Sequence, residues 1–258
     1  DGIPGEQDNI VDTENIIGHW LRKRPDVRSR IVLATKAAGP VRGYGWLRNG
    51  SADVTADDIV AYCEASLKRL NTDVIDLYQL HWPTRNVPMF GNLYHDPKND
   101  RPVTPIDEQL RGLQRLVQAG KVRHVGVSNE TPWGVAEFVH QADAAGLPRI
   151  VSVQNGYSLL NRSVDNGLDE LLHRMQVSLL AYSPLAFGLL TGKYYAQGLT
   201  DPAKPGRLSI FEILTLRSFG ALGLAFECVS QGECERVIET IPGIDRQKIL
   251  FTPNFAPR

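Results

Sequence analysis

The sequence predicts an α/β fold in which parallel strands alternate with helices, as they do in a (β/α)8 TIM barrel. Two observations support this prediction: hydrophobic runs of strand length alternate with helical patterns, and each run stops at a polar residue. The runs cover residues 31–36, 74–80, 122–127, 150–153 and 177–181 and lead into Lys36, His81, Ser128 with Asn129, Gln154, and Tyr182 with Ser183. Because the carboxyl ends of barrel strands meet at one rim, these polar side chains are expected to share a pocket.

Capping residues bound the helical patterns between these runs. Thr55 is a good N-cap, because its side chain can accept from the free amides while Asp58 sits at the third helical position. Proline in the first turn and glycine after the last turn mark other helix ends. The expected starts and stops are Thr13 and Pro25, Thr104-Pro105 and Gly120, and Thr131-Pro132 and Gly146.

The strand count falls short of the eight that a closed barrel needs. A sixth run covers residues 237–241, and residues 207–236 hold too few hydrophobic positions for two clean helices. We therefore expect one barrel domain over residues 1–258 whose first two strands and part of the seventh helix, near residues 210–222, are absent. A fragment explains this better than a shortened relative, because six strands would leave two apolar sheet edges unpaired.

Length and composition fit one globular domain. A chain of 258 residues is close to the common barrel size of about 250 residues. A hydrophobic share of 42% and a charged share of 22% are typical of soluble proteins. The formal net charge of −1 gives no electrostatic reason to expect nucleic acid or a membrane as partner. Three cysteines cannot all pair with one another and indicate a reducing compartment.

Lys36 and His81 are the sharpest catalytic candidates. A lysine at the inner end of a strand can depress the pKa of a neighbouring acid, and a histidine at the next strand end can bind a substrate carbonyl or pass a proton. Each residue alone is better explained as a solvated lysine or a core histidine. Their positions at the ends of consecutive strands favour function modestly.

The remaining polar strand ends suggest a site for a flat polar ligand. Ser128, Asn129 and Gln154 offer hydroxyl and amide groups, although strand-end capping is an equally ordinary role. Tyr182 could stack on an aromatic ring or simply fill the core. Residues 185–193 contain two glycines and a lysine after a strand, which weakly suggests an anion-binding loop. No Rossmann or Walker motif occurs, and the Cys and His spacing gives no metal site.

The longest irregular segment covers residues 83–103 and follows directly on His81. Loops of this length in compact domains tend to be functional. We expect this one, with Phe90 and Tyr94, to form part of a substrate pocket wall beside Trp82. An interface with another subunit is the alternative.

Four segments resemble motifs of the aldo-keto reductase family. They are residues 66–83 around His81, residues 120–129, residues 154–161, and Tyr182-Ser-Pro-Leu185 with Thr191-Gly-Lys-Tyr194. The long insert after His81 resembles the Tas-like branch of that family. The resemblance implies a (β/α)8 barrel that binds NADP(H) and reduces aldehyde or ketone carbonyls, and it implies cytoplasmic localisation, with the plastid stroma as the alternative.

The resemblance also implies roles by position. Lys36 and His81 match two members of the catalytic tetrad, and Ser128, Asn129 and Gln154 match the residues that hold the nicotinamide carboxamide. Tyr182 matches the residue that stacks on the nicotinamide ring. The positions that match the pyrophosphate loop are Ser183, Leu185, Gly188 and Lys193. Arg246 matches the 2′-phosphate contact.

Two tetrad members, an aspartate and a tyrosine, have no match, since they belong to a segment before Thr13 and no tyrosine precedes Tyr44. The sequence therefore leaves two further classes open. One is a catalytically silent subunit that binds nucleotide and acts as a regulatory or scaffolding partner. A weaker one is an unrelated barrel enzyme. The expected partners are a small carbonyl substrate and further copies of the chain in a homo-oligomer or larger assembly.

Overall fold

The computed structural model describes residues 12–40, 53–88, 94–191, 226–228 and 249–251. The chain divides into two compact units. The first contains residues 1–89 and 94–182, and the second contains residues 90–93 and 183–258. The expected single domain over residues 1–258 stays a prediction.

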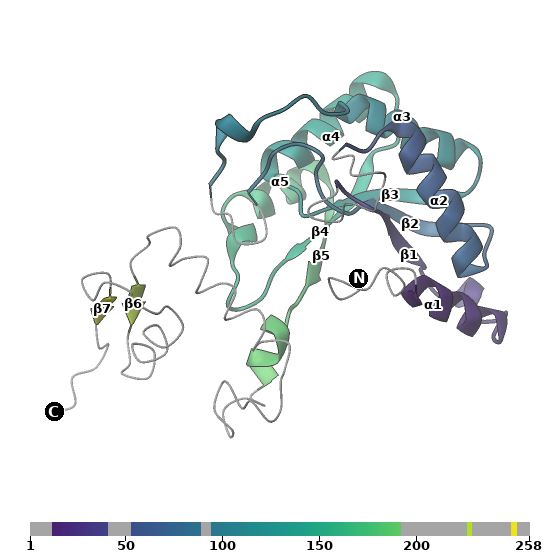
Figure 1. Ribbon diagram of the computed structural model, residues 1–258, viewed down its shortest axis with the longest axis horizontal. Coiled ribbons are helices and arrows are strands. Elements are labelled where there is room, and N and C mark those ends of the chain that lie inside the picture. The colour runs from purple at the N-terminus through teal and green to yellow at the C-terminus, as the bar shows by residue number, and fades with distance from the viewer. Residues whose placement is uncertain (1–11, 41–52, 89–93, 192–225, 229–248, 252–258) are drawn as a thin grey trace. The chain divides into compact units, whose positions relative to one another are not determined.

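A five-stranded parallel sheet forms the first unit (Figure 1). Neighbouring strands follow one another in sequence, and a helix precedes or connects them, which is the topology of a βα barrel. The predicted parallel α/β fold is thus confirmed. The strands are β1 (Ala34–Ala37), β2 (Ile75–Leu80), β3 (Val122–Ser128), β4 (Ile150–Gly156) and β5 (Ser178–Tyr182); the helices are α1 (Asp12–Arg22), α2 (Ala56–Leu70), α3 (Ile106–Gln118), α4 (Pro132–Ala145) and α5 (Leu168–Met175).

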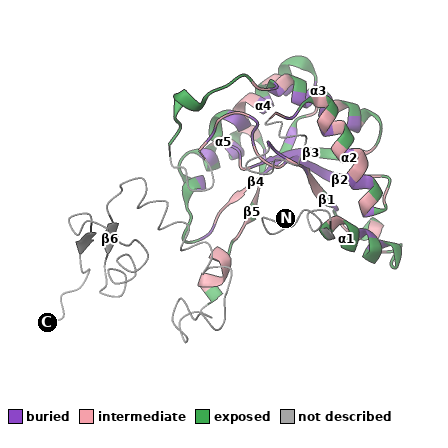
Figure 2. Ribbon diagram, viewed as in Figure 1, coloured by how far each residue is buried: buried purple, intermediate pink, exposed green. Residues whose placement is uncertain are grey.

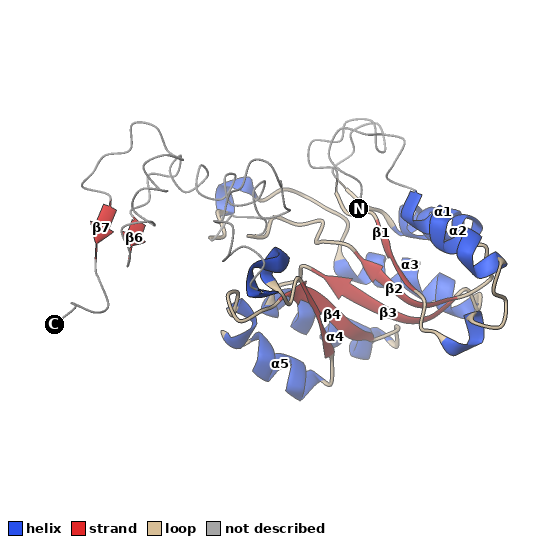
Figure 3. Ribbon diagram, turned by 90° about the horizontal axis from the view of Figure 1, so that it is seen from below, coloured by secondary structure: helices blue, strands red, loops and turns tan. Residues whose placement is uncertain are grey.

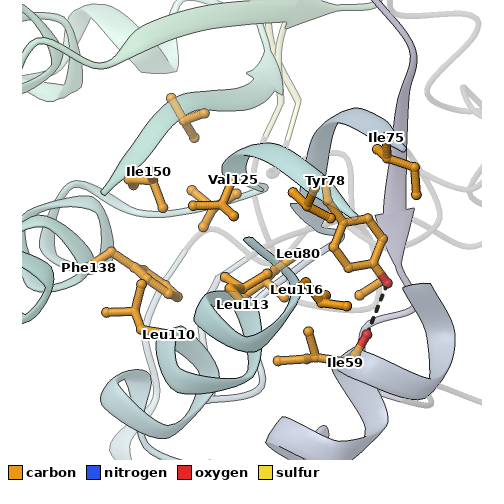
Figure 4. Close-up of a cluster of buried hydrophobic side chains, with 14 of the residues drawn as sticks. Ile59, Ile75, Tyr78, Leu80, Leu110, Leu113, Leu116, Val125, Phe138 and Ile150 are labelled. Carbon is orange, nitrogen blue, oxygen red and sulfur yellow. Dashed lines mark hydrogen bonds between the residues drawn. The ribbon is translucent and has the colours of Figure 1, made fainter. Parts of the chain in front are cut away.

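The hydrophobic core lies between the sheet and its helices (Figures 3 and 4). Tyr78 of β2 points toward α2, where its hydroxyl donates to the Ile59 carbonyl at 3.4 Å. Leu110 and Leu113 of α3 and Phe138 of α4 pack on the same face. Figure 2 shows β2 and β3 as the most buried strands, whereas β5 is only half-buried.

The opposite face of the sheet is polar, because successive side chains of a strand point to opposite faces. Lys36, Gln79, Gly126 and Ser152 are register partners in β1 to β4. A Cβ atom at Gly126 would lie 2.7 Å from the Ser152 hydroxyl, so this glycine allows the two neighbouring polar side chains to come close. In a barrel this face is the interior.

Most predicted helix ends are confirmed. Thr55 and Asp58 form a reciprocal capping box, Thr131 caps α4, and Gly146 ends α4 in the left-handed region. The cap predicted at Thr104 is wrong. Pro105 is the N-cap of α3 without a side-chain bond, because the Thr104 amide and hydroxyl both donate to Asp53.

The strand bounds differ from the predicted runs most at the start of β1 and at the end of β4, which continues to Gly156. β1 begins at Ala34, three residues late, and Val32 is 78% exposed. The run at 237–241 lies outside the described residues. The second unit contains β6 (Phe226–Cys228) and β7 (Ile249–Phe251), a parallel pair that the sequence did not predict. Within the described ranges, no helix has the length and apolarity needed to cross a membrane.

The contact between α1 and α2 gives a stability prediction. A Cβ atom at Gly18 would lie 2.0 Å from the Arg69 carbonyl oxygen, which is backbone and cannot move aside. Alanine favours a helix by about 1 kcal/mol over glycine, but forcing atoms into a packed contact costs about 1–3 kcal/mol or more. We expect Gly18→Ala to lower the free energy of unfolding, measured by urea titration. Asn15→Ala on the exposed face of α1 is the control and should not lower it.

Candidate functional site

The Asn129 side chain joins three strand ends. Its Nδ2 donates to the His81 carbonyl at 2.9 Å, and its Oδ1 accepts from the Tyr182 hydroxyl at 2.8 Å. His81 follows β2, Asn129 follows β3 and Tyr182 ends β5. Asn129 adopts a left-handed backbone with φ 54°, a conformation that asparagine tolerates better than most residues. Three predicted site residues therefore belong to one hydrogen-bonded group.

Gln154 and Ser128 extend this group to β4. The Gln154 carbonyl accepts from the Ser128 hydroxyl at 2.7 Å and from the Asn129 amide at 3.0 Å. The Gln154 carboxamide is only half-buried and makes no hydrogen bond with the part of the chain that the structure describes. It is thus left to bind a ligand that offers both a donor and an acceptor.

Lys36 and His81 lie on the same face of adjacent strands, since Lys36 is the register partner of Gln79, two residues before His81. Burial lowers the pKa of the half-buried Lys36. Burial, and then the Lys36 charge, lower the His81 pKa to about 4. His81 is therefore neutral near pH 7. Because its pKa in the unfolded chain is about 6.5, protonation of His81 opposes folding as the pH falls from about 6.5 to about 4.

Trp82 forms a wall beside this pair. Its ring centroid lies 4.2 Å from that of His81, and its Nε1 donates to the Pro40 carbonyl at 3.1 Å. A Cβ atom at Gly39 would lie 2.3 Å from Nε1, so only glycine fits behind the indole. Tyr94 is 81% exposed, and its expected place in a substrate pocket wall stays a prediction. Phe90 lies outside the described residues.

The predicted pyrophosphate loop begins in the second unit. Residues 183–191 form tight turns in which the Ala186 amide donates to the Ser183 carbonyl and the Gly188 amide to the Leu185 carbonyl, each at 2.9 Å. Gly188 has φ 97° and Leu185 is 54% exposed. These residues belong to the second unit, and their predicted contact with the pyrophosphate stays a prediction. Lys193 and Arg246 lie outside the described residues.

Sequence reasoning missed a second polar group directly behind the site. The Arg85 guanidinium pairs with Glu130, the residue after Asn129, and the Asn155 carboxamide binds the Glu130 backbone. The one available signal was the placement of a charged residue immediately after a strand end. Within the described ranges, no cluster of three or more His, Cys, Asp or Glu side chains could hold a metal ion.

Comparison with known proteins identifies the class. The family model for the aldo/keto reductases matches residues 11–220, so the chain belongs to this family of (β/α)8-barrel oxidoreductases. The family generally uses NADP(H) and acts on small-molecule carbonyl compounds.

Individual relatives refine this placement. An aldo-keto reductase of Babesia bovis is 44% identical over 204 residues, which are 75% of this chain and 71% of that protein. Protein tas of Escherichia coli is 44% identical over 182 residues, 70% of this chain and 52% of its own length. The NADH-specific methylglyoxal reductase of Escherichia coli is 31% identical over 203 residues, 74% of this chain and 53% of its own. The chain thus spans about half the length of the two bacterial relatives.

The charge of Lys36 gives a prediction for His81. We expect the wild-type imidazole to titrate with a pKa of about 4. Lys36→Met removes a positive charge that disfavours imidazolium, so the pKa should rise, yet stay below 6.5 because burial, the larger cause, remains. NMR titration of the imidazole measures both values, and the His81→Gln spectrum assigns the signal. An unchanged pKa in Lys36→Met would show that the two side chains do not interact.

Proposed function

We propose that the whole protein reduces aldehyde or ketone carbonyls with NADPH. The observation that carries the proposal is the Asn129 group, which joins His81 and Tyr182 beside Lys36 on the polar face of the sheet. Family membership alone gives an oxidoreductase with a nicotinamide cofactor. The arrangement of these side chains supports the more specific reaction.

The donors and acceptors at the rim fit a nicotinamide. A carboxamide ligand needs an acceptor for its NH2 and a donor for its oxygen, and the half-buried Gln154 side chain offers both. Ser128 and Asn129 lie beside it in the same group. The Tyr182 hydroxyl is held by Asn129, which fixes the ring from its polar end and leaves its face for stacking. When bound, the cofactor supplies the hydride.

The protein's own task is then to orient the carbonyl and to manage a proton. His81 is neutral near pH 7 and can donate one ring N–H to a carbonyl oxygen. Lys36 keeps a positive charge near this oxygen and would lower the pKa of a nearby acid. In the family that acid is a tyrosine, for which this sequence has no matching position.

Cofactor choice and the second unit are further parts of the proposal. Ser183, Leu185, Gly188 and Lys193 would bind the pyrophosphate, and Arg246 the 2′-phosphate that distinguishes NADPH from NADH. Since one relative is named as NADH-specific, both cofactors need testing. We place the protein in the cytoplasm.

A catalytically silent, nucleotide-binding subunit is the second candidate. Such a protein would bind NADPH as tightly as an enzyme does but would turn nothing over.

Binding of NADPH is the first test. Two of the four tryptophans, Trp82 and Trp133, lie beside or behind the rim, so titration with NADPH should quench the fluorescence and saturate. Gln154→Leu should weaken binding about tenfold or more, because the nicotinamide carboxamide would lose the donor and the acceptor that the Gln154 side chain offers. Leu159→Ala, at a 73% exposed position on the loop after β4, is the control and should not. Absence of saturable binding at millimolar NADPH and NADH would reject the proposal.

Turnover by the whole protein is the second test. Lys36→Met should lower kcat on a generic aldehyde by about a hundredfold or more, since it removes the charge that favours the ionised proton donor. Its circular dichroism and its Kd for NADPH should stay close to wild type. Near-normal turnover would show that Lys36 has no catalytic role. Saturable binding with no turnover by the wild type would favour the silent subunit.

A further inference from the structure

A polar group of three residues lies next to the Asn129 group, with Glu130 buried and Arg85 and Asn155 half-buried. The Arg85 guanidinium donates to both carboxylate oxygens of Glu130, one at 3.0 Å, and the Glu130 side chain is only 3% exposed. The Asn155 carboxamide pairs with the Glu130 backbone in both directions: its Oδ1 accepts from the amide at 3.0 Å and its Nδ2 donates to the carbonyl at 2.8 Å. We call Arg85, Glu130 and Asn155 the Arg85 clamp.

Each member of the clamp is close in sequence to a site residue. Glu130 follows Asn129, Asn155 follows Gln154, and Arg85 lies four residues after His81. The clamp therefore links the ends of β2, β3 and β4, the same strand ends that carry the site. Ser128 of the Asn129 group and Arg85 and Glu130 of the clamp line the same small pocket, so the two groups are neighbours.

The surroundings of the clamp hold it in one geometry. The Arg85 guanidinium also donates to the Thr131 hydroxyl at 3.1 Å and lies 5.0 Å from the Trp133 ring centroid. A Cβ atom at Gly134 would lie 2.2 Å from both Arg85 Nη2 and Glu130 Oε1. The first turn of α4 thus leaves room for the ion pair only because glycine is present there.

Stability alone does not account for such a group. A buried ion pair gains little over a well-packed apolar pair, because both charges must leave water, whereas its directional bonds fix one arrangement. Binding and hydride-transfer sites tolerate little misplacement, and an error of about 1 Å can cost about a hundredfold in rate. The value of the clamp therefore lies in the precision that it gives to its neighbours.

We propose that Arg85, Glu130 and Asn155 are positioning residues that hold Asn129 and Gln154 in the geometry that binds the nicotinamide carboxamide. This inference rests on the proposed function for its ligand. None of the three residues touches the cofactor; they act through the backbone of β3 and β4. Their loss should weaken cofactor binding beyond any general loss of stability.

The structure offers a matched control at the other end of the same sheet. Asp76, near the start of β2, accepts from Arg28 at 2.7 Å and from the Leu33 amide at 2.8 Å, and its side chain is 7% exposed. Asp76→Asn disrupts a buried ion pair as Glu130→Gln does, but far along the strands from the rim. A purely structural clamp would make the two variants alike.

The experiment measures Tm and the Kd for NADPH in three variants: Glu130→Gln, Asn155→Ala and Asp76→Asn. Asn155→Ala changes no charge and is the milder of the two clamp variants. We expect all three to lower Tm. The Kd should rise tenfold or more in the two clamp variants and stay within twofold of wild type in Asp76→Asn. The double variant Arg85→Met with Glu130→Leu should recover Tm without recovering the Kd. Clamp variants with a wild-type Kd, or a double variant that recovers both, would overturn the proposal.

Hydrogen exchange separates this proposal from the proposed function. The Asn129 amide donates to the Gln154 carbonyl, so its exchange reports the β3–β4 junction without any cofactor. Asn155→Ala should accelerate it tenfold or more, while Asp76→Asn should not. If the wild type binds neither NADPH nor NADH, the proposed function fails, but the exchange rate of the Asn129 amide still tests the positioning role of the clamp. An unchanged exchange rate in Asn155→Ala would reject that role.

Discussion

The hydrogen bonds that the Asn129 carboxamide makes with His81 and Tyr182 are the interaction on which the site depends. One residue fixes the backbone beyond β2 and the ring at the end of β5, with its own strand between them. An amide suits this role because it carries a donor and an acceptor on one side chain, whereas a carboxylate lacks the donor. The left-handed backbone at Asn129 directs the side chain back along the rim, and its amide meets Gln154. The segments that follow β2, β3 and β5 are thus all hydrogen-bonded to Asn129 or contain it.

The two-residue period of the strands places this group opposite the core. On β2, Tyr78 and Leu80 are buried in the core cluster beneath the helices, while Gln79 and His81 face the other way. That polar face carries a cost, because Gln79 Nε2 and Ser152 Oγ are buried in the described structure without hydrogen-bond partners. The polar rim therefore rests on a partly unsatisfied layer. The Arg85 clamp adds directional hydrogen bonds between the ends of β3 and β4 beside this layer.

The sequence predicted the rim well because a hydrophobic run must end where the strand leaves the core. This rule alone placed His81, Ser128 and Gln154 at strand ends, whereas their roles in binding and catalysis stay predictions. The same rule failed at the start of β1, since Val32 is hydrophobic yet exposed and the Leu33 amide binds the Asp76 side chain instead of a strand. The Arg85–Glu130 pair joins residues 45 apart in sequence. No local pattern encodes such a pairing, because it arises only when the strand ends come together.

The electrostatics of the rim follow from the same arrangement. Lys36 and His81 are both half-buried, and burial lowers the pKa of each side chain because it disfavours the charged form. The lysine, whose ordinary pKa is about four units higher, keeps its charge, and that charge then disfavours imidazolium. The pair therefore settles as one cation and one neutral hydrogen-bond donor. A histidine at an isolated strand end would lack the neighbouring lysine charge that, after burial, lowers its pKa. The low pKa of His81 therefore depends partly on the position of Lys36 on the adjacent strand.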